Sequence, residues 1–318
     1  VMQDTRPFIL VLASAILFGV SVPLAKIILE DVPPVSLAGL LYLGAFLGLS
    51  VLGVAGKRAE SKALDSRELP WLAGVVLFGG VLAPVFLMLG LLQVSGFAAS
   101  LFLNLEGVAT ALIAAAIFRE FTGRRFWIAL CCMTAAGLLL SWNPTGSGFS
   151  ITGPIFIILA MLFWGLDNNF TRKITSMEPV EIARVKCFFA GVINLGIGFL
   201  LGAKLVAGES LLFAVIVGTF CYGVSLVLFI HSLRAWGAAR TGAFFSVAPF
   251  VGAVASVLLL NESIGWNLLP AFALMAAGAW LIISEKHAHG HYHRNVYHAH
   301  EHLHDEEHQH GHGAGRVR

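Results

Sequence analysis

The sequence predicts an all-α integral membrane protein: ten transmembrane helices in two inverted five-helix repeats, followed by a disordered, His-rich C-terminal tail. The chain of 318 residues is 58% hydrophobic and only 12% charged, with a mean hydropathy of +0.84. It therefore lacks the charged shell of a soluble protein. Its charges gather in short segments between long apolar runs, and its two halves resemble each other. Lipid is the predicted solvent for most of its surface.

The first five apolar runs each have the length of a membrane-spanning helix. A run of about 17–22 residues crosses a hydrocarbon core of ~30 Å at 1.5 Å per residue. The runs do not alternate apolar with polar residues, which favours helices over barrel strands. Helix-breaking residues follow them, such as Pro33 after the first and Pro144 after the fifth. The predicted helices cover residues 8–29, 35–55, 71–92, 97–118 and 126–142.

The first run is interpreted as a retained span and not as a cleaved signal peptide. Arg6 precedes it, as a basic residue precedes a signal peptide, but its apolar stretch is longer than a typical signal core. It continues into Glu30 and Asp31 without a small-x-small cleavage pattern.

Five further runs complete the predicted membrane region. They cover residues 152–171, 182–203, 211–232, 241–260 and 266–284, and Pro179 separates the first two. The predicted organisation is one five-helix repeat over residues 1–143, a second over 144–285, and the tail over 286–318.

Basic residues fall at alternate connections, which predicts the orientation of the chain. With the N-terminus in the cytoplasm, almost every loop Lys or Arg lies on the cytoplasmic side, whereas Lys204 and Lys26 lie toward the other. Basic residues concentrate in cytoplasmic loops. We therefore expect a multi-pass protein of the cell inner membrane with both termini in the cytoplasm. The cytoplasmic set is Arg6, Lys57, Arg58, Lys62, Arg67, Arg119, Arg124, Arg125, Arg172, Lys173, Arg184, Lys186, Arg234 and Arg240.

Two pairs of segments indicate an internal repeat. The small-residue-rich segment that starts at Gly96 and runs on to Glu120 can be aligned with the one that runs from Ala238 to Glu262. Residues 17–27 likewise match residues 163–174. The first predicted helix thus matches the sixth, and the fourth matches the ninth. Because the repeat has an odd number of helices, its two copies must be inverted in the membrane, an arrangement typical of transporters.

At these residues the chain resembles the EamA-type branch of the drug/metabolite transporter superfamily. The resemblance rests on Phe18-Gly19, on Phe163-Trp164-Gly165, and on the two segments that close on Glu120 and Glu262, and it spans about residues 8–284. It implies a bundle of five plus five helices with a central cavity, cytoplasmic termini, and export of amino acids or other small metabolites. The ninth helix keeps the proline that the family favours, Pro249, whereas the fourth has Asn104-Leu-Glu106-Gly107 at the matching place.

Six residues are the candidate substrate or coupling site. Glu106 lies mid-membrane, where a carboxylate costs about 2.5–3.5 kcal/mol, so it must face a cavity or a partner. It is either a functional carboxylate or a hydrogen-bonded structural one. Asp167 is either functional or paired with Arg172 at the interface. Lys26 and His231 near helix ends are explained as well by snorkelling and by an interfacial imidazole. The candidate set is Glu106, Asn104, Asp167, Asn168, His231 and Ser246.

Other polar and aromatic residues are assigned structural roles. Glu120 and Glu262 are expected to pair or cap at helix ends, and the Gly and Ala residues of the fourth and ninth helices to pack closely. Tryptophans at span ends, Trp71, Trp142 and Trp266, fit the interfacial belt. The four cysteines lie inside spans without metal-like spacing and are expected to be buried thiols: Cys131, Cys132, Cys187 and Cys221.

The tail carries eleven of the twelve histidines, many at a spacing of two residues. Neutral imidazoles at this spacing on an extended chain can chelate Zn, Ni, Co or Cu. The tail has little apolar content and is predicted to be disordered without metal. Metal binding for buffering or sensing and an idle solvated tail both remain open. The candidate ligands are His287, His289, His291, His293, His298, His300, His302, His304, His308, His310 and His312.

These patterns predict a secondary active transporter, with export of a small metabolite or amino acid and a metal-binding tail. The alternative is a transition-metal (Ni, Co or Zn) exporter that collects ions with the tail. A membrane enzyme lacks support, since the sequence contains no intramembrane HxxxH, paired-Asp or nucleotide-binding motif. No cofactor is required, and the expected partners are a small-molecule substrate and membrane lipids, without nucleic acid. The oligomeric state is expected to be a monomer or homodimer.

Overall fold

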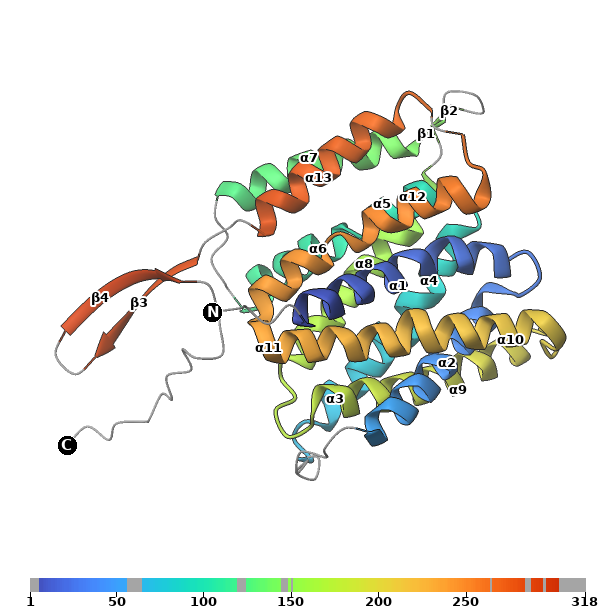
Figure 1. Ribbon diagram of the computed structural model, residues 1–318, viewed down its shortest axis with the longest axis horizontal. Helices are drawn as coiled ribbons and strands as arrows, with labels where there is room; N and C mark the ends of the chain where they lie inside the picture. Colours follow the sequence, from blue (N-terminus) through green and yellow to red (C-terminus); the bar gives the residue numbers. More distant parts are fainter. Residues whose placement is uncertain are drawn as a thin grey trace.

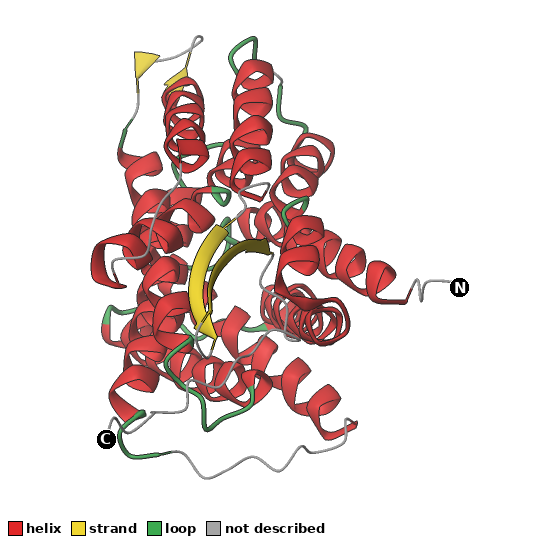
Figure 2. Ribbon diagram, turned by 90° about the vertical axis from the view of Figure 1, so that its left-hand side faces the viewer, coloured by secondary structure: helices red, strands yellow, loops and turns green. Residues whose placement is uncertain are grey.

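The computed structural model is a bundle of long helices with a short hairpin beside one end (Figures 1 and 2). It describes residues 6–55, 65–118, 124–143, 148–149, 151–263, 265–283, 287–293 and 296–302. The N-terminus lies at the same end of the bundle as the hairpin (Figure 1).

The first half of the chain contains five spans. The third is continuous but changes from α-helix to a π-helical segment, η1, and back, and the fourth is broken at Leu103 and Asn104. The elements are α1 (Arg6–Ile28), α2 (Pro34–Ala55), α3 (Leu69–Gly74), η1 (Val75–Leu82), α4 (Ala83–Leu91), α5 (Gly96–Phe102), α6 (Leu105–Phe118) and α7 (Arg124–Ser141).

The second half repeats these irregularities in the same order. Its third span contains a second π-helical segment, η2, and its fourth is broken at Ser246 and Val247. The elements are α8 (Thr152–Thr171), α9 (Pro179–Leu200), α10 (Gly208–Val217), η2 (Gly218–Val224), α11 (Ser225–Phe245), α12 (Ala248–Leu260) and α13 (Leu268–Ile283). Between the halves, β1 (Trp142–Asn143) pairs antiparallel with β2 (Gly148–Phe149).

Among the described residues, eight helices are long and apolar enough to cross a membrane, and two shorter apolar ones are Ala248–Leu260 and Leu268–Leu281. The sequence predicts ten spans at these places. The difference arises in part because α11 continues past the eighth predicted run, so that the ninth is divided between α11 and α12. Many outward side chains are apolar, with Leu200 88% and Trp280 70% exposed. Such a surface is stable in lipid and not in water.

Contacts between the halves come in exchanged pairs. α1 packs on α11 and α12, and correspondingly α8 packs on α4 and α6. α2 packs on η2, and α9 packs on η1. Two further pairs join equivalent elements directly: α2 with α9, and α7 with α13. These contacts therefore recur when the two halves are interchanged, whereas α5 packs on α12 at one end of the bundle only.

Glycine allows the closest of these contacts. A Cβ on Gly218 would lie 2.3 Å from the Leu41 carbonyl oxygen, and one on Gly44 would lie 2.5 Å from the Val215 carbonyl oxygen. No side chain fits at such distances, so α2 and the third span of the second half approach backbone to backbone. This is the usual role of small residues in membrane helix packing.

Composition predicts a disordered tail, and within it the structure describes two strands. β3 (His287–His293) pairs antiparallel with β4 (Val296–His302). A residue spacing of two is also the side-chain period of a strand. Residues 303–318 lie outside the described part of the chain.

Candidate functional site

A cavity of about 400 Å³ lies between the two halves. Helices of both halves line it, and its walls combine aromatic rings with two acidic side chains, Glu106 and Asp167, and one basic side chain, Lys186. The remaining lining residues are Ser14, Phe18, Tyr42, Ala45, Trp164, Asn168, Cys187, Tyr222, Ser225, Leu226, Phe229 and Phe245.

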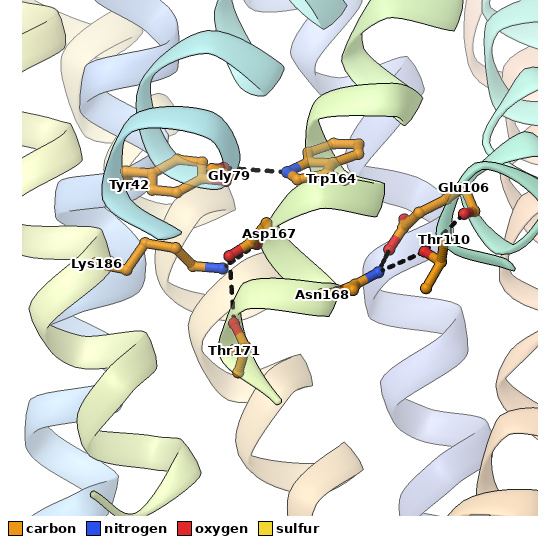
Figure 3. A network of polar contacts seen from close by, with 9 residues as sticks. All are labelled: Tyr42, Gly79, Glu106, Thr110, Trp164, Asp167, Asn168, Thr171 and Lys186. Atoms are coloured by element: carbon orange, nitrogen blue, oxygen red, sulfur yellow. Dashed lines mark hydrogen bonds and ion pairs between the residues drawn. The ribbon is translucent and has the colours of Figure 1, made fainter. Parts of the chain in front are cut away.

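An ion pair joins two neighbouring helices in this cavity (Figure 3). Nζ of Lys186, on α9, lies 2.7 Å from Oδ2 of Asp167, on α8. The Asp167 side chain is 5% exposed and that of Lys186 is 19% exposed. The Thr171 hydroxyl, one turn further along α8, donates to Oδ1 of Asp167 at 3.4 Å. Charges inside a membrane protein are retained where they pair or face a cavity, and here both conditions hold.

Glu106 lies on the opposite side of α8 from this pair (Figure 3). The break at Leu103 and Asn104 places Glu106 in the first turn of α6, where the helix dipole favours a carboxylate. Nδ2 of Asn168 donates to Glu106 Oε1 at 2.9 Å and to the Thr110 hydroxyl at 3.1 Å. Asp167 and Asn168 are consecutive, so α8 directs one polar side chain to each acidic group.

Two backbone carbonyls of η1 form part of the same network. Pro84 has no N–H, so one carbonyl of the preceding turn lacks its helical hydrogen bond. The carbonyls of Gly79 and Gly80 accept hydrogen bonds from side chains of other helices. The Tyr42 hydroxyl donates to Gly79 at 2.7 Å, Trp164 Nε1 donates to Gly79 at 3.1 Å, and Asn194 Nδ2 donates to Gly80 at 3.2 Å. The π-helical segment η1 is therefore tied to α2, α8 and α9.

Gly79 also leaves the space that Asp167 occupies. A Cβ built on Gly79 would lie 2.1 Å from both Cγ and Oδ2 of Asp167. The absence of a side chain at this position thus lets the carboxylate reach Lys186.

The structure brings half of the predicted site residues together. Glu106, Asp167 and Asn168 line the cavity. Asn104 donates to the Leu101 carbonyl at the helix break. His231 is exposed near the end of the eighth span. Ser246 follows the last residue of α11. None of these three is a lining residue.

Lys186, Tyr42 and Trp164 belong to the site, although sequence reasoning did not select them. A signal for Lys186 exists in the sequence, because it is a cation inside an apolar run, but the residue also fits the basic set of a cytoplasmic connection. Asp167 pairs with Lys186 and not with Arg172.

The residues assigned structural roles are placed as follows. Glu262 caps the start of α5, whereas Glu120 lies outside the described residues. The four cysteines are free thiols; Cys187 and Cys221 are buried, but Cys131 is exposed on the outer face of α7. Trp71, Trp142 and Trp266 are all exposed at span ends.

Among the side chains that the structure describes, no three His, Cys, Asp or Glu residues come together as a metal site. The tail histidines are outside this set, so the predicted ligand role of their side chains stays a prediction.

Comparison with known proteins agrees with the resemblance in sequence. The EamA-like transporter family matches the chain twice, over residues 5–142 and 151–284. An uncharacterized transporter of Methanothermobacter thermautotrophicus is 27% identical over 272 residues, which are 80% of this chain and 79% of that protein. A protein of known crystal structure shares the fold, with a TM-score of 0.63 at 18% identity over 88% of this chain and 96% of that one. The chain is therefore a multi-pass membrane protein of the EamA-like transporter family, which is a family of transporters and not of enzymes.

Proposed function

We propose that the protein is a secondary active transporter that carries a small polar metabolite, an amino acid in the first instance, through the cavity between its halves. The observation that carries this proposal is the gathering of Glu106, Asp167 and Lys186 in one cavity within the membrane region. Ionisable groups at this depth mark substrate and ion pathways in membrane proteins. The sequence contains no nucleotide-binding loop, so an ion gradient is the proposed energy source.

The charges of the cavity suit a zwitterion. Two carboxylates face one ammonium group, so the empty site has an excess of acceptors. The ammonium group of the substrate would bind Glu106, and its carboxylate would compete with Asp167 for Lys186. The aromatic rings of Phe18, Tyr222 and Phe229 would cover the apolar part of the substrate.

Glu106 is the proposed coupling group. Its side chain is held by the neutral amide of Asn168, whereas Asp167 has a lysine partner. Protonation of Glu106 removes a charge from the cavity without breaking an ion pair. A proton on Glu106 and the ammonium group of the substrate would then be alternative occupants of one site.

We further propose that the two halves are inverted repeats, related by a two-fold axis in the membrane plane. The exchanged helix contacts, the π-helical segments in both third spans and the breaks in both fourth spans support this relation. Such repeats alternate the access of a central site. The basic residues at alternate connections favour cytoplasmic termini, and the family resemblance favours export.

The His-rich tail is proposed to bind Zn, Ni, Co or Cu as a buffer or sensor and not to deliver cargo. The alternative, a transition-metal exporter, calls for several His, Cys or carboxylate ligands around one point of the path. The cavity lining holds Glu106, Asp167 and Cys187, but among the described residues no three such ligands come together as a metal site. An organic cargo therefore fits the described residues better.

Flux of labelled amino acids into proteoliposomes with an imposed pH gradient tests the proposal. The wild type should accumulate at least one of them, and Glu106→Gln should lose the dependence on the gradient. Glu209→Gln, which removes an exposed carboxylate at the start of α10, is the matched control and should behave as the wild type. Normal pH-dependent transport by Glu106→Gln would contradict the assigned role.

A further inference from the structure

The turn between the third and fourth spans is gripped from both sides by charged side chains. It joins the end of α4 to the start of α5 and lies at the end of the bundle opposite the N-terminus (Figure 1). Nζ of Lys26, near the end of α1, donates to the carbonyl oxygens of Leu91 and Val94, both at 2.6 Å. A cation is thus placed at the C-terminal end of α4 and on the turn that follows it, where the helix dipole favours a positive charge.

The other side of the turn is held by Glu262. Its two carboxylate oxygens accept from the backbone N–H groups of Gly96 and Phe97, at 2.6 and 2.9 Å. These are the first N–H groups of α5 and have no partner within the helix. Asn261 makes this reach possible, because its left-handed backbone (φ 51°) ends α12 and turns the chain.

The two charges come from different halves of the protein, yet they hold one turn. Beside them α5 packs tightly on α12. A Cβ on Gly96 would lie 2.7 Å from the Ser256 hydroxyl, and Ser100 and Ser256 are fully buried. This end of the bundle is therefore closed by a polar grip over a layer of small residues.

At the other end of the bundle, the corresponding faces of α6 and of the end of α11 are open. Gly107, further along the fourth span, and Gly242, in the second half, would each accept a Cβ without any atom within 4 Å. Both glycines are exposed, and Phe245, one turn from Gly242, lines the cavity. Closure is thus confined to the end where Lys26 and Glu262 lie.

We propose that Lys26 and Glu262 form a two-part lock on the turn at residues 92–95, and that its release is the step that opens the cavity at this end. The lock rests on the proposed transport function, since a closed end needs a lock only if it also opens. Each residue supplies charge-assisted hydrogen bonds, which are stronger than neutral ones. Removing either charge should therefore raise the population of the state that is open at this end.

Thiol labelling tests the lock without knowledge of the substrate. The full chain, with Cys131, Cys132, Cys187 and Cys221 replaced by serine, is placed in lipid nanodiscs that expose both faces to a water-soluble maleimide. Ser100→Cys reports the closed end, and in a second background Leu226→Cys reports the cavity. Lys26→Met and Glu262→Gln are introduced into each. The controls are Lys26→Arg, Lys204→Met and Glu209→Gln. The connection from Lys204 to Glu209 lies at the same end of the bundle, because the neighbouring Ser210 donates to Asp31.

Lys26→Met and Glu262→Gln should raise the labelling rate at position 100 about tenfold or more, as expected for the loss of about 1.4 kcal/mol. The rate at position 226 should not rise, because the reagent reaches the cavity from one face or the other in both states. The controls should leave both rates unchanged. An unchanged rate at position 100 overturns the lock. A rise at both positions also overturns it, because it indicates general loosening. If labelling at position 100 changes as expected but no flux assay detects transport, the lock stands and the proposed transport function is refuted.

Discussion

Nζ of Lys186 lies 2.7 Å from Oδ2 of Asp167, and this ion pair forms part of the wall of the central cavity. The pair links α8 to α9, and the next residue of α8, Asn168, holds Glu106 of the other half. One turn of α8 thus connects the charges of both halves. A substrate that enters the cavity meets this arrangement as a whole.

Replacing Lys186 by Met should destabilise the protein more than removing the pair. Lys186→Met leaves the buried Asp167 carboxylate without its partner, a change that typically costs about 3–5 kcal/mol. Lys186→Met with Asp167→Asn removes both charges and should recover most of this loss, while substrate flux stays low. Thermal unfolding of the purified variants measures the effect, with Lys186→Arg as the charge-retaining control. A double variant no more stable than Lys186→Met would refute the idea that the unpaired Asp167 carboxylate causes the loss of stability.

Adding one methyl group at Gly79 should disturb the site. The new Cβ would meet the Asp167 carboxylate at 2.1 Å, so Gly79→Ala should displace Asp167 from Lys186 and lower the melting temperature. The matched control is Gly196→Ala on α9, where a Cβ has no atom within 4 Å. That change should be neutral or stabilising by up to about 1 kcal/mol through helix propensity. Equal melting temperatures for the two variants would contradict the assigned contact.

Glu68 should make stability depend on pH in acid. Hydrogen bonds from the Ser176 hydroxyl and from the backbone and hydroxyl of Thr175 lower the pKa of Glu68 from 4.5 to about 2. Because the folded pKa is the lower one, the contribution of Glu68 is complete above about pH 4.5 and is lost as the pH falls toward 2. Glu68→Gln should therefore melt below the wild type at neutral pH, and the gap should close over this range. A gap that is the same at pH 7 and pH 2 would argue against these bonds.

Deletion of residues 287–318 separates a regulatory tail from a metal cargo. The truncated protein should lose tight Zn or Ni binding and any dependence of transport on these ions, while organic flux is unchanged. A flexible ligand array mainly raises the local ion concentration. Vesicle flux of radiometal and of amino acid is measured for both forms. Metal flux in both, without organic flux in either, would favour the exporter of transition metals.

The helical framework could be predicted from the sequence because each span carries its own signal of length and hydropathy. The pairing of Gly96–Glu120 with Ala238–Glu262 predicted the repeat. Glu106 and Asp167 were found because a carboxylate in an apolar run stands out by itself. What could not be predicted depends on contacts between distant helices.

Two features of the site illustrate this limit. Lys186 lies near the start of its run and resembles an interfacial basic residue until α8 is placed beside α9. The role of Gly79 depends on Pro84, which lacks the N–H of a helical hydrogen bond. It also depends on Tyr42 and Trp164, whose side chains donate to the Gly79 carbonyl. No local pattern marks the carbonyl as an acceptor for side chains on two other helices. Likewise, Lys26 is explained by snorkelling until the Leu91 and Val94 carbonyls are seen at 2.6 Å.

The most direct test of the central claim, that the cavity is the substrate site, is protection of a cavity thiol by a transported substrate. Leu226→Cys, as the single cysteine, is labelled in the proteoliposomes used for flux, with and without the amino acid that is transported. The substrate should slow this labelling in a saturable way and leave labelling of Asp65→Cys, an exposed position outside the spans, unchanged. Saturable transport with no protection at position 226 would contradict the assignment of the cavity.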